Sequence, residues 1–265
     1  MRAGRPSLTA RWVAVQRARL AHTRPSTPSG DVRGEHALVR DVSGVFALPL
    51  GRPTRLAERT AFIDNEVASA LGRGVTQVVI LGAGYDGRPL RFGGGATRWF
   101  EVDFPSTQAD KRRRLARLGV GTEQIAFVPI DLLTGDLGSA LDAAGHDRSA
   151  PSLFIGEGLL SYLTLEASAD LLRTLRGGAA PGSVLVTTFL ETDGPRGAGQ
   201  AIRAAWTGLL RLIGEPKRTE FLPGDPEKLL VVTGWNIVRT HDTPASRFDP
   251  TAHSLVLAGV PAPGE

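Results

Sequence analysis

The chain has 265 residues, 42% of them hydrophobic, which is enough to bury one good core with an appendage. Its 31 basic and 27 acidic residues give a formal net charge of +4 that is spread along the sequence, so we expect no nucleic-acid partner. The absence of cysteine excludes disulfides, thiolate metal ligands and cysteine nucleophiles, and no apolar run is long enough to span a bilayer.

The first 54 residues have the features of an irregular helical arm, and residues 55–265 those of the core that this arm covers as a lid, all within one structural domain. Residues 7–22 show helical periodicity, with Ser7 as a plausible N-cap. Residues 31–45 form a second, weaker helix candidate.

Arginines of this arm, such as Arg11, Arg17 and Arg19, have two interpretations. They could orient an anionic substrate, but we expect them to be solvated surface charges. The N-terminus carries arginines and no apolar h-region, so we expect no secretory signal and a cytoplasmic protein.

Residues 55–71 have an apolar stripe and are followed by glycines, which predicts a helix leading into the first strand. Arg59 lies in the first turns of this helix. It could hold a ligand carboxylate as a bidentate partner. A surface pair with Glu58 or Asp64 is the equally weighted alternative.

The central stretch combines a buried strand at 78–81, a glycine turn at 82–87 and a second strand at 99–103 that ends in the acid Asp103. This order is typical of nucleotide binding, because glycines allow close backbone approach and a terminal acid can accept ribose hydroxyls. The turn matches GxGxxG, which favours a dinucleotide. However, only one or two helical turns fit at 88–92, which favours S-adenosylmethionine, a ligand without phosphate.

A helix should follow at 105–118, and we expect its basic run, 111–114, to form a solvated face. Residues 125–130 predict a third strand. Asp131 directly after it lies where ligands bind at the carboxyl edge of a parallel sheet. Capping of the following turn is the alternative role for Asp131.

A fourth strand at 152–155 precedes Glu157, which stands between Gly156 and Gly158 and is followed by Tyr162. Exposure alone explains a glutamate at such an edge, but it explains neither the flanking glycines nor the tyrosine. We therefore expect a functional role for Glu157.

The remaining segments complete an α/β fold with a mostly parallel sheet. They are a helix capped by Thr164, a strand at 184–189, a loop at 194–199, a helix at 201–213, a mixed segment at 229–236, and closing antiparallel strands at 236–240 and 254–258.

These motifs together resemble the leucine carboxyl methyltransferase family. The matching segments are Arg59 with FID after it, VVILGAGYDGRPLR at 78–91, FEVDFP at 100–105 with Lys111, PIDLL at 129–133, IGEGLLSYL at 155–163 and PGS at 181–183. The resemblance implies a Rossmann-like fold of class I S-adenosylmethionine-dependent methyltransferases, a family that includes bacterial polyketide carboxyl O-methyltransferases.

The resemblance also implies roles for single residues, which we treat as expectations. The residues expected to bind the cofactor S-adenosyl-L-methionine are Arg59 at the methionine carboxylate, Gly82, Ala83 and Gly84 along the methionine and ribose path, Asp103 and Glu101 at the ribose, Asp131 and Leu132 at the adenine, and Glu157 at the methionine amine. Glu157 and Tyr162 are the candidate catalytic residues, and we assign no metal ligands. Gly87 departs from the family, because many members carry a threonine or serine there.

Methyl transfer to a carboxylate needs alignment and desolvation but no general base, because the acceptor is already ionised. The five histidines are scattered, and we expect surface or packing roles for them. We therefore expect a methyl ester on a small-molecule carboxylic acid, such as a polyketide-type metabolite. A phenol or hydroxyl acceptor served by a base such as His22, His36 or Tyr162 stays open. A nicotinamide-dependent oxidoreductase and a non-catalytic binding protein are the remaining alternatives, and the oligomeric state is unknown.

Overall fold

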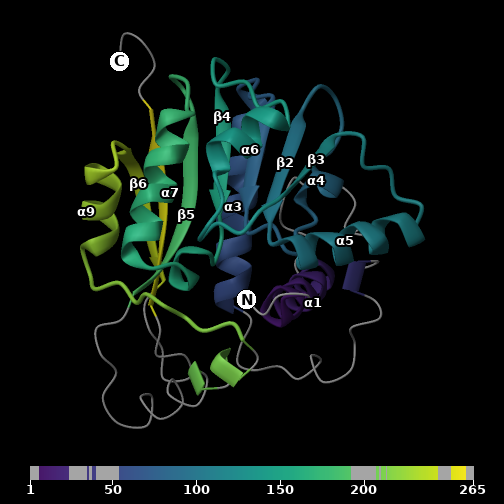
Figure 1. Cartoon of the computed structure of the whole chain (residues 1–265), viewed down its shortest axis with the longest axis horizontal. Helices are drawn as coiled ribbons and strands as arrows, with labels where there is room; N and C mark the ends of the chain where they lie inside the picture. Colours follow the sequence, from purple (N-terminus) through teal and green to yellow (C-terminus); the bar gives the residue numbers. More distant parts are fainter. Residues whose placement is uncertain are drawn as a thin grey trace.

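A computed structural model describes residues 6–23, 35, 38, 39, 54–191, 207, 208, 210–212, 214–243 and 252–260. Its centre is a seven-stranded sheet with the order β3-β2-β1-β4-β5-β7-β6 (Figure 1). The strands are β1 (Gln77–Leu81), β2 (Arg98–Asp103), β3 (Ile125–Pro129), β4 (Ser152–Gly156), β5 (Val184–Glu191), β6 (Asn236–Thr243) and β7 (Ala252–Gly259).

The first five strands run parallel, and β7 alone pairs antiparallel, with β5 on one side and β6 on the other. All five residues of β1 are buried, as expected for a central strand covered on both faces. Because parallel strands end at the same edge, the segments that follow β1, β2, β3 and β4 meet there. That edge therefore gathers the glycine turn and the predicted acids.

Helices cover both faces of the sheet, and Figure 1 shows α6 and α7 in front with α3 behind. The described helices are α1 (Leu8–Thr23), α3 (Thr54–Gly72), α4 (Arg88–Arg91), α5 (Pro105–Arg117), α6 (Leu137–Ala143), the 3-10 turn η2 (Leu160–Tyr162), α7 (Leu165–Gly177) and α9 (Asp225–Val232). None of them combines the length and apolarity that a bilayer crossing requires.

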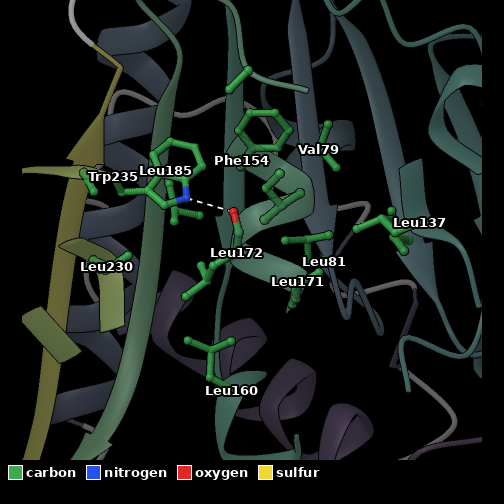
Figure 2. Close-up of a cluster of buried hydrophobic side chains, with 14 of the residues drawn as sticks. Val79, Leu81, Leu137, Phe154, Leu160, Leu171, Leu172, Leu185, Leu230 and Trp235 are labelled. Atoms are coloured by element: carbon green, nitrogen blue, oxygen red, sulfur yellow. Dashed lines mark hydrogen bonds between the residues drawn. The ribbon is translucent and has the colours of Figure 1, made fainter. Parts of the chain in front are cut away.

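Alternation along the strands divides the core between the two faces. Val79 packs with Phe154 and the leucines of α7, whereas Val78 and Ile80 pack with the apolar stripe of α3. Figure 2 shows the first cluster, in which Trp235 is 1% exposed and donates its indole Nε1–H to the Leu172 carbonyl at 3.0 Å.

Most of the predicted elements are confirmed, including both closing strands and the short helix after the glycine turn. Two side-chain caps are confirmed as well. Ser7 Oγ accepts from Ala10 N–H at 3.0 Å, and Thr164 Oγ1 accepts from Ala167 N–H at 3.2 Å.

Two helices were not predicted, because their apolar patterns are short or incomplete. Helix α6 has seven residues, and only two of them, Leu137 and Leu141, are buried. Helix α9 buries Leu229 and Leu230, but the next two residues, Val231 and Val232, are largely exposed, so no clean stripe marks it.

The arm is described mainly through α1, which lies beside α5 and one end of α3 (Figure 1). Ala14, Val15 and Ala18 of α1 pack with Tyr85 and Leu115. The division at residue 54 stays a prediction. The predicted helix at 31–45, the loop at 194–199 and the helix at 201–213 lie wholly or largely outside the described residues.

Replacing Trp235 by phenylalanine should lower the free energy of unfolding through lost packing and one lost buried hydrogen bond worth about 1 kcal/mol. Trp99→Phe is the matched control, because Trp99 is fully buried but its Nε1 has no hydrogen-bond partner among the described residues. Urea denaturation of both variants measures the difference. An equal or larger loss in Trp99→Phe would contradict the importance of the Trp235 hydrogen bond.

Candidate functional site

The glycine turn lies under α1 at the carboxyl end of β1. Gly82 and Gly84 have φ values of 62° and 51°, which favour glycine. A Cβ on Gly82 would lie 3.2 Å from Leu159 Cδ1, and one on Gly84 would lie 2.9 Å from Ala10 Cβ in α1. The backbone of the turn, including the buried Ala83, is therefore closely covered from two sides.

Asp103 ends β2 beside this turn and is 5% exposed. Its carboxylate accepts the Gly84 N–H through Oδ2 and the Phe104 N–H through Oδ1, the latter at 2.5 Å. Burial raises the pKa of Asp103 to about 6, against the lowering effect of these two backbone bonds. The structure thus brings Asp103 and Gly84 together, as expected for neighbours in one ligand site.

Glu101 lies two residues earlier on the same face of β2 and is 1% exposed. Its Oε1 accepts from Lys111 Nζ at 2.6 Å, and the same Nζ donates to the Asp86 carbonyl at 2.6 Å. Burial raises the pKa of Glu101 to about 7 even though Lys111 lowers it. The expectation of a solvated basic run is wrong for Lys111, because this side chain is buried and neutralises Glu101.

Asp131 follows β3 and is half-buried. Its Oδ1 accepts the Leu133 N–H at 3.0 Å, so the alternative role as a cap of the following turn is observed. The Ile130 N–H donates to the Asp103 carbonyl at 2.9 Å, which holds Asp131 at the same sheet edge. Leu132 packs against the core cluster of that face. The adenine-binding role of Asp131 and Leu132 stays a prediction.

The Glu157 carboxylate accepts hydrogen bonds from three arginines. Its Oε1 accepts from Arg59 Nε at 2.8 Å, and its Oε2 accepts from Arg17 Nη2 at 2.5 Å and Arg88 Nη1 at 2.9 Å. Burial by itself would raise the pKa of Glu157, but the three guanidinium groups hold it well below its usual range. Glu157 is therefore an ionised carboxylate and a poor proton acceptor at neutral pH.

These contacts disfavour one alternative for Arg59 and correct the expectation for Arg17. Arg59 pairs with Glu157 and not with Glu58 or Asp64. Arg17 is 8% exposed and contacts Glu157 and Asp86, so it is not a solvated charge.

The other two arm arginines have different outcomes. Arg11 donates to Asp110 Oδ2 at 2.9 Å and to the Tyr85 hydroxyl at 3.1 Å, which fixes α1 on α5. The side chain of Arg19 lies outside the described residues.

Four further charged residues extend the cluster around Glu157 and were not assigned roles from the sequence. Arg88 donates to Asp86 Oδ2 at 2.6 Å and to Asp64 Oδ1 at 2.7 Å, and Arg91 donates to Asp64 Oδ2 at 2.6 Å. Every one of them is buried. The spacing in YDGRPLR contained the relevant pattern, since an acid two residues before an arginine can pair across a tight turn.

Tyr162 lies on η2, and burial raises the pKa of its hydroxyl, which also interacts with the Thr9 side chain. Thr9 belongs to the N-terminal turn of α1. Glu215 caps that turn by accepting from Leu8 N–H at 2.6 Å and Ser7 Oγ at 3.1 Å. Tyr162, α1 and the segment after residue 214 therefore meet at one place.

Neither of the two histidines whose side chains are described contacts Glu157. His146 Nε2 is 2.9 Å from Ser152 Oγ at the opposite edge of the sheet, and His241 stacks on Phe62. His36 and the side chains of His22 and His253 fall outside the described part. Within that part, no cluster of His, Cys, Asp or Glu could hold a metal ion.

Comparison with solved structures identifies the fold. A protein of Thermobifida fusca YX, provisionally described as a methyltransferase, has a TM-score of 0.60 at 16% identity over 98% of this chain and 97% of its own. Magnesium protoporphyrin IX methyltransferase from Synechocystis PCC 6803, solved with bound SAH, has a TM-score of 0.52 at 17% identity over 84% of this chain and 93% of its own. The fold is that of the Rossmann-like, class I methyltransferases.

Sequence comparison is more specific. Residues 47–176 match the model of the leucine carboxyl methyltransferase family. This segment is therefore similar to that family, the same one that the sequence motifs resemble.

Two mycobacterial relatives are provisionally named S-adenosyl-L-methionine-dependent methyltransferases. One from Mycolicibacterium smegmatis is 37% identical over 66% of this chain and 58% of its own length. One from Mycolicibacterium vanbaalenii is 42% identical over 51% of this chain and 44% of its own. The chain thus matches about half the length of these relatives.

Glu157→Gln should lower the free energy of unfolding by about 3–5 kcal/mol, because three buried guanidinium groups lose their shared counter-charge. The control is Asp170→Asn, which breaks an exposed pair with Arg173 and should change stability by less than about 1 kcal/mol. Equal stability of the two variants in denaturant titrations would show that the Glu157 cluster contributes little.

Proposed function

We propose that this protein is an S-adenosylmethionine-dependent O-methyltransferase. The observation that carries the proposal is the arrangement at the carboxyl edge of the sheet, where a glycine turn, an acid after β2 and an arginine-bound glutamate after β4 converge. The names of the relatives and the family match support it.

The side chains present fit this cofactor. Arg17 Nε and Arg88 Nη2 are buried donors without hydrogen-bond partners among the described residues, which suits a carboxylate. Glu101 Oε2 is a buried acceptor that also has no hydrogen-bond partner among the described residues. It lies two residues before Asp103 on β2, and a free acceptor at this place suits a ribose hydroxyl.

A dinucleotide fits less well, because α4 has only four residues and offers little helix dipole to a pyrophosphate. This short helix disfavours the nicotinamide-dependent alternative.

In this proposal, each site residue has one task. Arg59, joined by Arg17, would hold the methionine carboxylate, and Glu157 would hold the amine. Gly82, Ala83 and Gly84 would line the path to the ribose, with Asp103 and Glu101 at its hydroxyls. Asp131 and Leu132 would frame the adenine.

The reaction would require little proton transfer by the protein. When bound, the cofactor would supply a methyl group on a positively charged sulfur, and the acceptor oxygen would bond to the methyl carbon as the carbon–sulfur bond breaks and the neutral thioether leaves. Glu157 remains ionised and acts electrostatically, because its pKa is held low. Tyr162 keeps its proton, because its pKa is raised, and would donate a hydrogen bond to the acceptor oxygen. The cover formed by α1 would exclude water from the centre.

We propose a small-molecule carboxylic acid, such as a polyketide-type metabolite, as the acceptor. The support is the family description and the lack of contact between Glu157 and either of the two described histidine side chains. A carboxylate needs no base there, whereas a phenol would.

The acceptor class can be tested by product chemistry. The protein, radiolabelled S-adenosylmethionine and a panel of carboxylic acids should give a product that releases volatile methanol in mild alkali, as a methyl ester does. A label that stays in the product after alkaline treatment would indicate an ether from a phenol or alcohol and would overturn the carboxylate proposal.

Isothermal titration should show micromolar binding of S-adenosylmethionine and of its demethylated product, with binding lost in Asp103→Ala. The reason is that Asp103 would supply the acceptors for the ribose diol. Wild-type protein that binds neither compound would refute the proposed function, and a nicotinamide dinucleotide would be the next titrant.

The affinity should also depend on pH. The pKa of Asp103 is raised to about 6, and the ribose hydroxyls need the ionised form as acceptor. Binding should therefore tighten as the pH rises from about 5 to about 7, by at most about tenfold per pH unit below the pKa. Asp103→Asn should bind weakly and lose this slope. A wild-type affinity that is constant over that range would contradict the role of Asp103.

A further inference from the structure

Glu35, a residue of the arm, fills the space left by the missing side chain of Gly87. The backbone of Gly87 has φ −98° and ψ 4°, which other residues adopt freely. The restriction is steric, because a Cβ at this position would lie 1.8 Å from Glu35 Cγ. Glu35 therefore occupies the space that a threonine or serine side chain at position 87 would need.

The Glu35 carboxylate begins a chain of alternating charges that ends at Glu157. Arg91 Nε donates to Glu35 Oε1 at 3.0 Å, and Arg91 Nη1 donates to Asp64 Oδ2 at 2.6 Å. Arg88 Nε donates to Asp64 Oδ1 at 2.7 Å, and Arg88 Nη1 donates to Glu157 Oε2 at 2.9 Å. The side chains of all five residues are at most 7% exposed.

Each member of this chain holds the next in one orientation. The planar guanidinium of Arg91 is fixed on two sides, because Nη2 also donates to Asp64, at 3.1 Å. Without Glu35, Arg91 Nε loses the Glu35 carboxylate, and the Arg91 guanidinium and the Asp64 carboxylate can then turn together. Buried ion pairs are sensitive to such losses, because the remaining charges have no water to compensate them.

We propose that Glu35 is a positioning residue for Glu157, through which docking of the arm sets the methionine end of the cofactor site. The inference rests on the proposed function, since it assigns Glu157 to the amino-acid part of S-adenosylmethionine. Arg17 of α1 donates to the same Glu157 oxygen, Oε2, as Arg88 does, so two separate parts of the arm act on one group.

The test compares two ligands that share the methylthioadenosine part and differ in the aminocarboxypropyl group and the sulfonium charge that comes with it. S-adenosylmethionine and 5′-methylthioadenosine, which lacks the amino-acid part, are titrated into wild type, Glu35→Gln and the control Glu58→Gln. Glu58 is an exposed glutamate of α3. Glu35→Gln should weaken S-adenosylmethionine binding roughly fivefold or more, with 5′-methylthioadenosine and the control unchanged.

The possible outcomes separate the inference from the proposed function. If wild type binds neither ligand, the proposed function fails. If wild type binds both and Glu35→Gln binds S-adenosylmethionine equally well, the positioning role alone fails. An equal loss for both ligands would indicate general loosening and would also overturn the positioning role.

A steric cycle provides an independent check. Gly87→Ser should lower the midpoint of thermal unfolding and weaken S-adenosylmethionine binding when Glu35 is present. In a Glu35→Ala background, which lacks the clashing Cγ, Gly87→Ser should leave the midpoint nearly unchanged, while binding stays weak. The same drop in both backgrounds would show that Glu35 does not occupy this space.

Discussion

The site depends on one buried carboxylate that is shared by three guanidinium groups. Glu157 follows β4, whereas Arg17, Arg59 and Arg88 come from α1, α3 and α4. Buried charges are tolerated only when each is paired with good geometry, so this cluster fixes four separate elements relative to one another. Such a cluster adds little net stability compared with well-packed apolar residues, although removal of one of its charges is costly. In the proposed function, this cluster would receive the amino-acid part of the ligand.

A zwitterionic ligand suits this environment, because it can exchange partners without leaving a net charge behind. Its carboxylate would take donors from the arginines, and its amine would take an acceptor from Glu157. The neighbouring acids on β2 have the opposite character, since burial favours their protonated forms. The end of the site around Glu157 is therefore strongly ionic. At the other end, Glu101 and Asp103 have pKa values close to neutral pH.

The sequence predicted the sheet, the glycine turn and the edge acids, because buried strands and positive-φ glycines have local patterns. It did not predict α6 and α9, whose apolar stripes are too short or interrupted. It also misjudged Arg17 and Lys111, which are buried by partners more than sixty residues away or on another element. Whether a charge is solvated depends on tertiary neighbours, and no local pattern contains that information.

The position of β7 has a consequence for synthesis of the chain. This strand comes last among the seven but lies between β5 and β6, pairing with both. Until residues 252–259 have left the ribosome, β5 presents an open edge and β6 has no place in the sheet. We therefore expect a nascent chain that stalls before this strand to be a good client for chaperones, and the sheet to be completed only after β7 has been synthesised.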